Sequence, residues 1–210
     1  MRLALATLGV GLIALFAASA GRVHAATPAT FTITGGSVTI ELANDLLSTL
    51  ANDEAVLTTA GGAKLSLSKT KQRLLTLPVG KGTLQLAGAS RTLQFTMRGS
   101  LVVTGNGTTA TLTQPYFLAG VGTDQVGFVV RGTRTAVVEF PKIALPGSFR
   151  GATFTLSGLD GIVPSGLGWV FAGYAEHPGD AGNGPAPHFG STGEVRFGTL
   201  YATLKVKRSK

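Results

Sequence analysis

The stretch RTLQFTMRGSLVVTGNGTTATLTQPYF, residues 91–117, decides the class of fold. Its apolar side chains recur at every second position and would share one face: Leu93, Phe95, Met97, Leu101 and Val103. Polar side chains alternate with them, and successive side chains of a strand point to opposite faces. Asn106-Gly107 follows, a pair that favours a two-residue hairpin turn. The stretch therefore predicts two antiparallel strands, each with one buried face.

The same alternation extends to most of the chain. It is present in residues 31–40, 126–130, 136–140, 152–158 and 194–206. One amphipathic helix is predicted at residues 43–51, with Asn44 as its cap and Asn52-Asp53 at its end. Thirty glycines in 210 residues are typical of short strands and tight turns. We predict one mainly β domain, an antiparallel β-sandwich or open barrel with one or two short helices.

The N-terminus predicts export. Met1-Arg2 precedes an apolar run that ends in small residues, and Val23-His24-Ala25 fits a cleavage site. Residues 1–25 are therefore predicted to be a signal peptide, and residues 26–210 a single secreted domain without a transmembrane segment. A retained membrane anchor is the alternative, since the apolar run is close to the shortest membrane span.

Charge and cysteine content exclude several classes of protein. Removing Arg2 and Arg22 with the signal peptide leaves 16 basic and 10 acidic residues, a net charge of +6. The basic residues are dispersed, which is not the pattern of a nucleic-acid-binding protein. Peripheral contact with anionic surfaces is the expected consequence. The absence of cysteine excludes disulfides, thiolate metal sites and thiol nucleophiles.

Residues 174–190, YAEHPGDAGNGPAPHFG, concentrate polar side chains. Four of them are possible ligands of a divalent metal: Glu176, His177, Asp180 and His188. Their spacing matches no compact ligand motif, and glycine and proline make this segment costly to order. The two interpretations are a solvated loop, which the composition favours, and a metal or ligand loop.

Three aromatic residues are candidate ligand contacts: Tyr116, Trp169 and Tyr174. Trp169 and Phe171 would share one face of a strand, where packing in the core is the ordinary role. Beside a glycine-rich loop, the same rings could hold a flat ligand or a sugar ring.

Motifs of enzymes are missing from the sequence. It holds no G-x-S-x-G elbow, no H-E-x-x-H and no phosphate-binding glycine loop. Asp124 and Asp160 stand in glycine-rich segments, where aspartate ordinarily stabilises turns. We therefore predict that the protein is not an enzyme.

Four segments carry a resemblance to a known family. TITGGSVTI leads into the amphipathic helix, FTMRGSLVV and TATLTQPYF follow, and FGTLYATLKV closes the chain. This arrangement resembles the HtaA-type domain of secreted and cell-surface proteins of actinobacteria, over roughly residues 31–206. The resemblance implies a β fold and, in some members, haem bound by a tyrosine near the early helix and a histidine in the following strand.

This sequence departs from the family at both positions. Glu41 to Leu50 contain no tyrosine, and Met97 stands where histidine is expected. Methionine can ligate haem iron, but Met97 lies on the apolar face of its strand. The resemblance therefore implies a divergent member without the usual haem ligands. Met97, Tyr116, His177 and His188 are the remaining candidates for haem, which we do not expect as a resident cofactor.

Two function classes follow from these observations. The first is a non-catalytic module of the cell envelope or extracellular space, structural or binding an envelope protein or polymer. The second is a small-ligand binding protein, with haem as the ligand suggested by the resemblance. An enzyme acting on an envelope polymer through an undetected site is a further alternative.

Overall fold

The computed structural model describes residues 28–87, 90–105, 107–120, 122, 124–140, 145–164, 167–171 and 195–209. Mainly β structure, as predicted, fills these ranges, with one helix of two turns and a second of a single turn. The predicted signal peptide and the segment with the four metal-ligand candidates lie outside the described residues.

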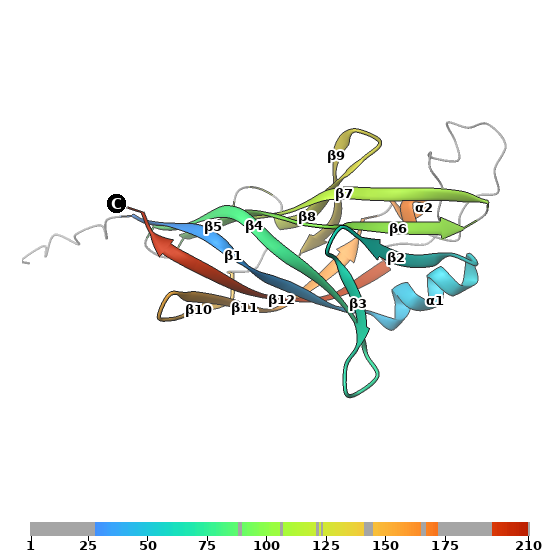
Figure 1. Cartoon of the computed structure of the whole chain (residues 1–210), viewed down its shortest axis with the longest axis horizontal. Coiled ribbons are helices and arrows are strands. Elements are labelled where there is room, and N and C mark those ends of the chain that lie inside the picture. The colour runs from blue at the N-terminus through green and yellow to red at the C-terminus, as the bar shows by residue number, and fades with distance from the viewer. Residues whose placement is uncertain are drawn as a thin grey trace, which may run out of the picture.

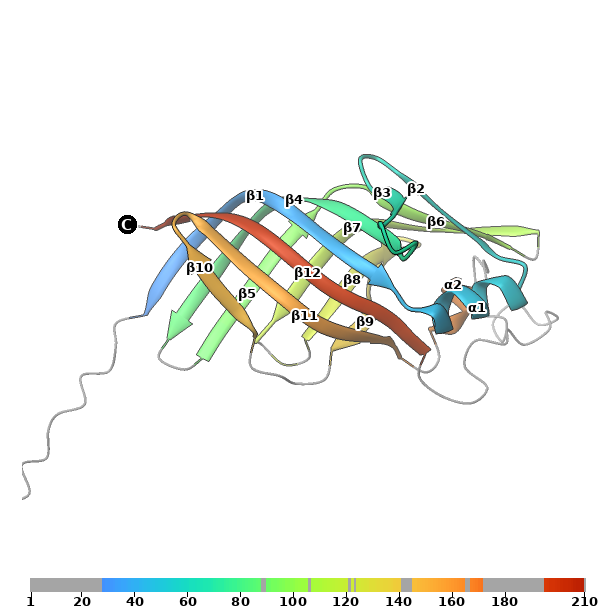
Figure 2. The same ribbon diagram turned by 90° about the horizontal axis from the view of Figure 1, so that it is seen from below.

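Antiparallel strands close into a barrel, which Figure 2 shows from the side. Their order around it is β7 (Thr108–Ala119), β5 (Ser90–Met97), β4 (Arg73–Ala87), β1 (Ala29–Leu42), β12 (Val195–Arg208), β11 (Thr153–Val163), β9 (Thr133–Phe140) and β8 (Asp124–Val130). β8 pairs with β7 and closes the ring. The prediction of a sandwich or open barrel is therefore only partly right, because closure depends on long-range pairing.

Four shorter strands and two helices complete the described fold. β6 (Ser100–Gly105) extends the sheet beside β7, and β2 (Val56–Ala60) pairs with β6. β3 (Lys64–Leu67) pairs with β4, and β10 (Gly147–Arg150) with β11. Figure 1 shows α1 (Asn44–Asn52) and α2 (Gly168–Phe171) near the end of the molecule away from the C-terminus.

The predicted apolar faces form the core. All five apolar residues of the opening stretch are buried, as are Leu200, Ala202, Leu204 and Val206 of β12. The predicted hairpin is confirmed, since Gly105 pairs with Thr108 and leaves two residues in the turn. In β9 both Val137 and Val138 are buried, because the register shifts against β8 between Val126 and Gly127.

The two helices differ from expectation in detail. α1 lies where predicted and buries Leu46 and Leu50, but Ala43 holds the cap position and Asn44 is already helical. The predicted Asn44 cap is therefore wrong. The predicted strand at Trp169 and Phe171 is also wrong, because Gly168–Phe171 is helical, with Phe171 fully buried. Within the described residues no helix has the length and apolar character needed to span a membrane.

β4 is absent from the segments predicted by alternation. Pro78, Gly80 and Gly82 interrupt its apolar pattern, although Leu75, Leu77, Val79 and Leu84 are buried. β4 pairs with both β1 and β5, and its register with β5 shifts between Val79 and Gly82. This irregularity lies beside a cleft on the outer wall of the barrel.

Candidate functional site

A cleft of about 490 Å3 lies on the outer face of the barrel wall. β4, β5 and β7 form its floor, and Arg134 reaches over it from β9. The lining residues are Lys81, Gly82, Thr83, Gln94, Phe95, Thr96, Tyr116, Phe117, Leu118 and Arg134. Phe95 and Phe117 are buried core residues, so the remaining side chains give the cleft its chemistry.

The irregularity in β4 shapes one end of the cleft. At the register shift, the Thr96 hydroxyl bridges the Lys81 backbone, accepting from its N–H and donating to its carbonyl oxygen, each at 3.3 Å. Gly80 approaches this hydroxyl so closely that an added Cβ would lie 2.7 Å from it. A bulge redirects a side chain from regular alternation. Here it leaves Lys81 exposed at the rim.

Tyr116 and Arg134 form the other end. Tyr116 pairs with Gly127 across β7 and β8, and its ring lies over that glycine, where an added Cβ would be 2.1 Å from the ring. The Arg134 guanidinium carbon lies 5.1 Å from the centroid of the same ring. A cation over an aromatic face is electrostatically favourable. Tyr116 therefore holds Arg134 at the cleft.

Neutral hydrogen-bonding groups lie between these two ends. The Gln94 side-chain amide donates to the Thr83 hydroxyl at 3.1 Å. Gln94 retains a second amide hydrogen and its carbonyl oxygen for a ligand. Among the described residues that line the cleft none is acidic, whereas Lys81 and Arg134 are cationic. The cleft therefore suits a polar ligand with negative charge.

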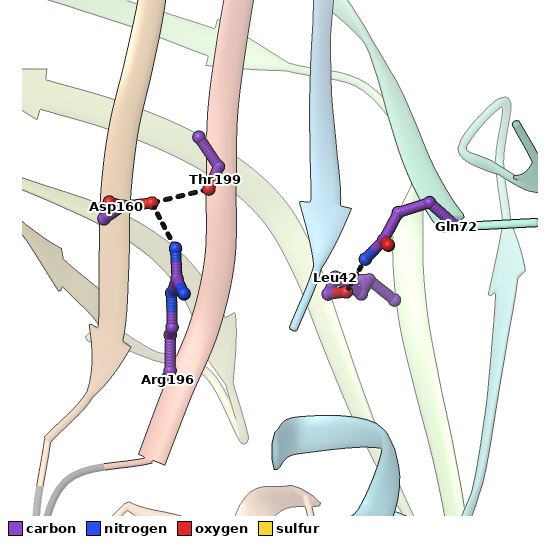
Figure 3. Close-up of polar contacts among 5 residues, drawn as sticks. All are labelled: Leu42, Gln72, Asp160, Arg196 and Thr199. Atoms are coloured by element: carbon purple, nitrogen blue, oxygen red, sulfur yellow. Dashed lines mark hydrogen bonds and ion pairs between the residues drawn. The ribbon is translucent and has the colours of Figure 1, made fainter. Parts of the chain in front are cut away.

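A separate polar cluster lies near the start of α1. Figure 3 shows Arg196 donating to Asp160 at 2.9 Å, with the Thr199 hydroxyl on the same carboxylate oxygen. The Thr199 and Arg196 hydrogen bonds lower the pKa of Asp160. Asp160 lies within β11, so its predicted place in a turn is wrong. Asp124 does have a turn role, because it accepts from the Gly120 N–H at 2.7 Å.

The hollow beside this cluster has about 350 Å3 and mixed charge. Glu41 and Asp45 line it with Arg196, and the Gln72 amide donates to the Leu42 carbonyl nearby at 2.7 Å (Figure 3). Arg196, the one cation among the described residues that line the hollow, is already paired with Asp160. The Arg196–Asp160 ion pair joins β12 to β11, and we assign it a structural role.

A third hollow of about 240 Å3 lies beneath α1. Its walls are mostly apolar and include Leu47, Leu50, Leu57 and Leu65, with Arg73 at one side. The described residues that line it include no tyrosine, histidine or methionine. The hollow is thus an apolar space without a side chain that commonly ligates iron.

Comparison with known proteins gives a likeness at the level of structure. No protein-family model matches the sequence, and no curated protein matches it. The C-terminal domain of HtaA from Corynebacterium glutamicum superposes with a TM-score of 0.54, covering 84% of this chain and 99% of that domain at 11% identity. The chain has the HtaA-type fold. The haem-binding protein HtaB from the same organism gives a TM-score of 0.47, covering 87% of this chain and 98% of that protein at 11% identity.

The resemblance seen in sequence is thereby confirmed for the fold. At this identity the HtaA-type fold does not carry a ligand with it, because one fold hosts many functions. Whether haem fits has to be judged from the residues present. Met97 is only 4% exposed and packs in the core, so its sulfur is not offered to a ligand. The early helix lines its hollow with leucine and alanine. At the two places where the sequence resemblance implies haem ligands, the described residues therefore offer no ligand to haem iron.

The structure places the candidate residues predicted from the sequence in different surroundings or leaves them outside the described residues. Tyr116 lies in the outer-wall cleft, Met97 in the core, and Trp169 on α2, where its side chain is not described. Tyr174, His177 and His188 lie outside the described residues, as do Glu176 and Asp180. Elsewhere in the described chain, no group of three acidic or histidine side chains could hold a metal.

Most of the cleft was not predicted. Lys81 and Arg134 count only as dispersed basic residues in the sequence, and Gln94 and Thr96 only as the polar face of a strand. The polar side chains on the outer face of residues 91–98 were the one signal of the cleft in the sequence. In an isolated sheet such a face is simply exposed to solvent, so the signal does not point to a binding site. The convergence of this face with Arg134 depends on the closure of the barrel by β8 and β9.

Proposed function

We propose that the protein is a non-catalytic binding domain whose outer-wall cleft holds an anionic ligand. The observation that carries this proposal is the pair of cations, Lys81 and Arg134, at a cleft whose described lining has no carboxylate. Because no acidic side chain of the described lining neutralises them, both cations are available to a negatively charged partner. Thr83, Gln94 and Thr96 add neutral hydrogen-bonding groups that orient it.

The residues that line the cleft also support a non-catalytic role. Described residues of the cleft include neither histidine nor carboxylate, the side chains that most often act as general acid or base. The Thr96 hydroxyl is engaged with the Lys81 backbone, and the Thr83 hydroxyl accepts from the Gln94 amide. This arrangement supports recognition, and no described residue supports activation of a nucleophile there.

A haem-like ligand is the second candidate. Tyr116 lies in the cleft, and a tyrosine phenolate is one of the protein groups that ligate haem iron. Lys81 and Arg134 could then pair with the propionates. This candidate differs from the first in one observable, since iron ligation changes the Soret absorbance of haemin.

The ligand is proposed to be met outside the cytoplasm. The predicted signal peptide supports export, and anionic polymers and proteins of the cell envelope are the proposed partners. We expect the mass of the mature protein, isolated from the cells that make it, to correspond to a chain that begins at Ala26. A mature chain that retains residues 1–25 would contradict export with cleavage and support the membrane anchor.

Removing both cations tests the site. The double substitution Lys81→Gln and Arg134→Gln is expected to weaken binding of anionic probes at least tenfold, because each charged hydrogen bond contributes about 1.5–3 kcal/mol. Amide signals of the labelled protein, recorded by NMR, would be followed during titration with haemin, tripolyphosphate and an oligogalacturonate. Binding should weaken further with added salt.

The matched control replaces two exposed cations elsewhere, Arg150 on β10 and Lys205 on β12, by glutamine. It changes the net charge equally and should leave the affinity nearly unchanged. If no probe moves the signals of the cleft residues, or if both double variants bind equally weakly, the cleft is not the ligand site.

A further inference from the structure

We infer that the ligand of the outer-wall cleft is a segment of an acidic sugar chain, with carboxylates on separate rings that reach Lys81 and Arg134. This inference rests on the proposed function, since it names the ligand class of the same site. Three features of the cleft carry it: the separation of the cations, the groups between them and the way in which Arg134 is held.

The two cations are too far apart to be contacted by one carboxylate. Lys81 belongs to β4, whereas the guanidinium of Arg134 lies over Tyr116 of β7, and β5 runs between these two strands. Neighbouring strands are about 4.8 Å apart, so the backbones of β4 and β7 are roughly 10 Å apart, and the two cations lie at opposite ends of the cleft. A polymer with a carboxylate on each ring can contact both at once.

The groups between the cations suit hydroxyl-rich rings. Thr83 and Gln94 lie on the outer face of β4 and β5. Gln94 keeps a second amide hydrogen and its carbonyl oxygen, and the Thr83 hydroxyl, which accepts from Gln94, keeps its hydrogen, so a donor and an acceptor remain for a ligand. Sugar hydroxyls also need both kinds of partner. An apolar macrocycle would bury these groups without partners, which costs binding energy. Tripolyphosphate offers acceptors only, so it would leave the Gln94 carbonyl oxygen unmatched.

The way in which Arg134 is held favours a carboxylate. One face of the Tyr116 ring lies on Gly127 and the Arg134 guanidinium stands over the ring, so this tyrosine orients the arginine. A guanidinium presents a planar fork of donors that matches a carboxylate in a bidentate manner. Pre-orientation of the fork lowers the entropy lost on binding.

Gln94→Leu is the variant that separates sugar recognition from charge alone. It removes the amide between the two cations and retains both charges. We expect it to weaken an oligogalacturonate about fivefold to tenfold, as for the loss of one or two neutral hydrogen bonds, and to leave tripolyphosphate unchanged. Gln85→Leu is the matched control, since Gln85 is an exposed glutamine of the neighbouring strand β4 outside the described cleft lining.

The experiment is a titration of the purified protein and these variants by calorimetry, with NMR to locate the perturbed amides. Neutral malto-oligosaccharide, tripolyphosphate and haemin are the comparison probes. Selective binding of the oligogalacturonate at the cleft, weakened about fivefold to tenfold in Gln94→Leu and unchanged in Gln85→Leu, is the expected result.

Two results would overturn the inference while leaving the proposed function in place. One is that tripolyphosphate or haemin binds at the cleft and the oligogalacturonate does not. The other is that Gln94→Leu weakens the oligogalacturonate and tripolyphosphate equally, which would mean recognition of charge alone. If no probe perturbs the cleft, both the inference and the proposed function are wrong.

Discussion

Replacing Gly36 by alanine is expected to lower the free energy of unfolding by about 3 kcal/mol or more. Gly36 lies in β1 opposite Leu204 of β12, with φ +135°, a value that L-residues with a side chain rarely adopt. An added Cβ would lie 2.0 Å from the Thr203 carbonyl oxygen. That oxygen belongs to the backbone of the paired strand, so the clash can be relieved only if β1 moves away from β12. The barrel needs the β1–β12 pairing for closure.

Thermal and urea unfolding followed by circular dichroism would measure this loss. For a chain of this length each kcal/mol lowers the Tm by about 2–4 °C. Gly35→Ala is the matched control, since Gly35 is the preceding residue and an added Cβ there has no neighbour within 4 Å. Equal losses for Gly35→Ala and Gly36→Ala would show that backbone freedom, and not the contact with Thr203, is the cause.

Replacing Phe117 by alanine should cost about 3–5 kcal/mol. Phe117 is 1% exposed, stacks on Phe95 with centroids 5.0 Å apart and contacts Phe140 at 6.0 Å. These three rings come from β5, β7 and β9, so they join three of four successive strands of the barrel wall. Truncation leaves a cavity that rigid neighbouring strands cannot fill.

The same unfolding experiment checks this prediction, with Phe149→Ala as the control. Phe149 is 41% exposed on β10, with Phe31 and Phe154 as ring neighbours, so its loss should cost only about 1 kcal/mol. A loss in Phe117→Ala no larger than that in Phe149→Ala would mean that the barrel interior rearranges around the missing ring.

Phe117 also lies directly behind the cleft, with its neighbours Tyr116 and Leu118 on the outer face. The two sides of β7 therefore have different roles, stability inside and recognition outside. Variants of the outer face, such as Gln94→Leu, should change binding without a comparable loss of stability. Because these variants are expected to fold, a loss of binding can be assigned to the cleft and not to unfolding.

The sequence by itself determined the strands with one buried face. Alternation has a period of two, which local inspection can read, and it placed Leu93, Phe95 and Met97 inside and Gln94 outside. The same reading located α1 and the hairpin after Gly105. It failed at β4, where Pro78 and two glycines interrupt the pattern, and at α2, whose apolar run fits strand or helix equally.

Only the tertiary structure decided that the barrel closes and that a cleft forms on its wall. Closure pairs β7 with β8 and brings Arg134 of β9 over Tyr116 of β7. The bulge between β4 and β5 sets Lys81 at the opposite rim. Alternation tells which face a side chain occupies but not which strands become neighbours, since pairing over long sequence separations depends on the packing of the whole core.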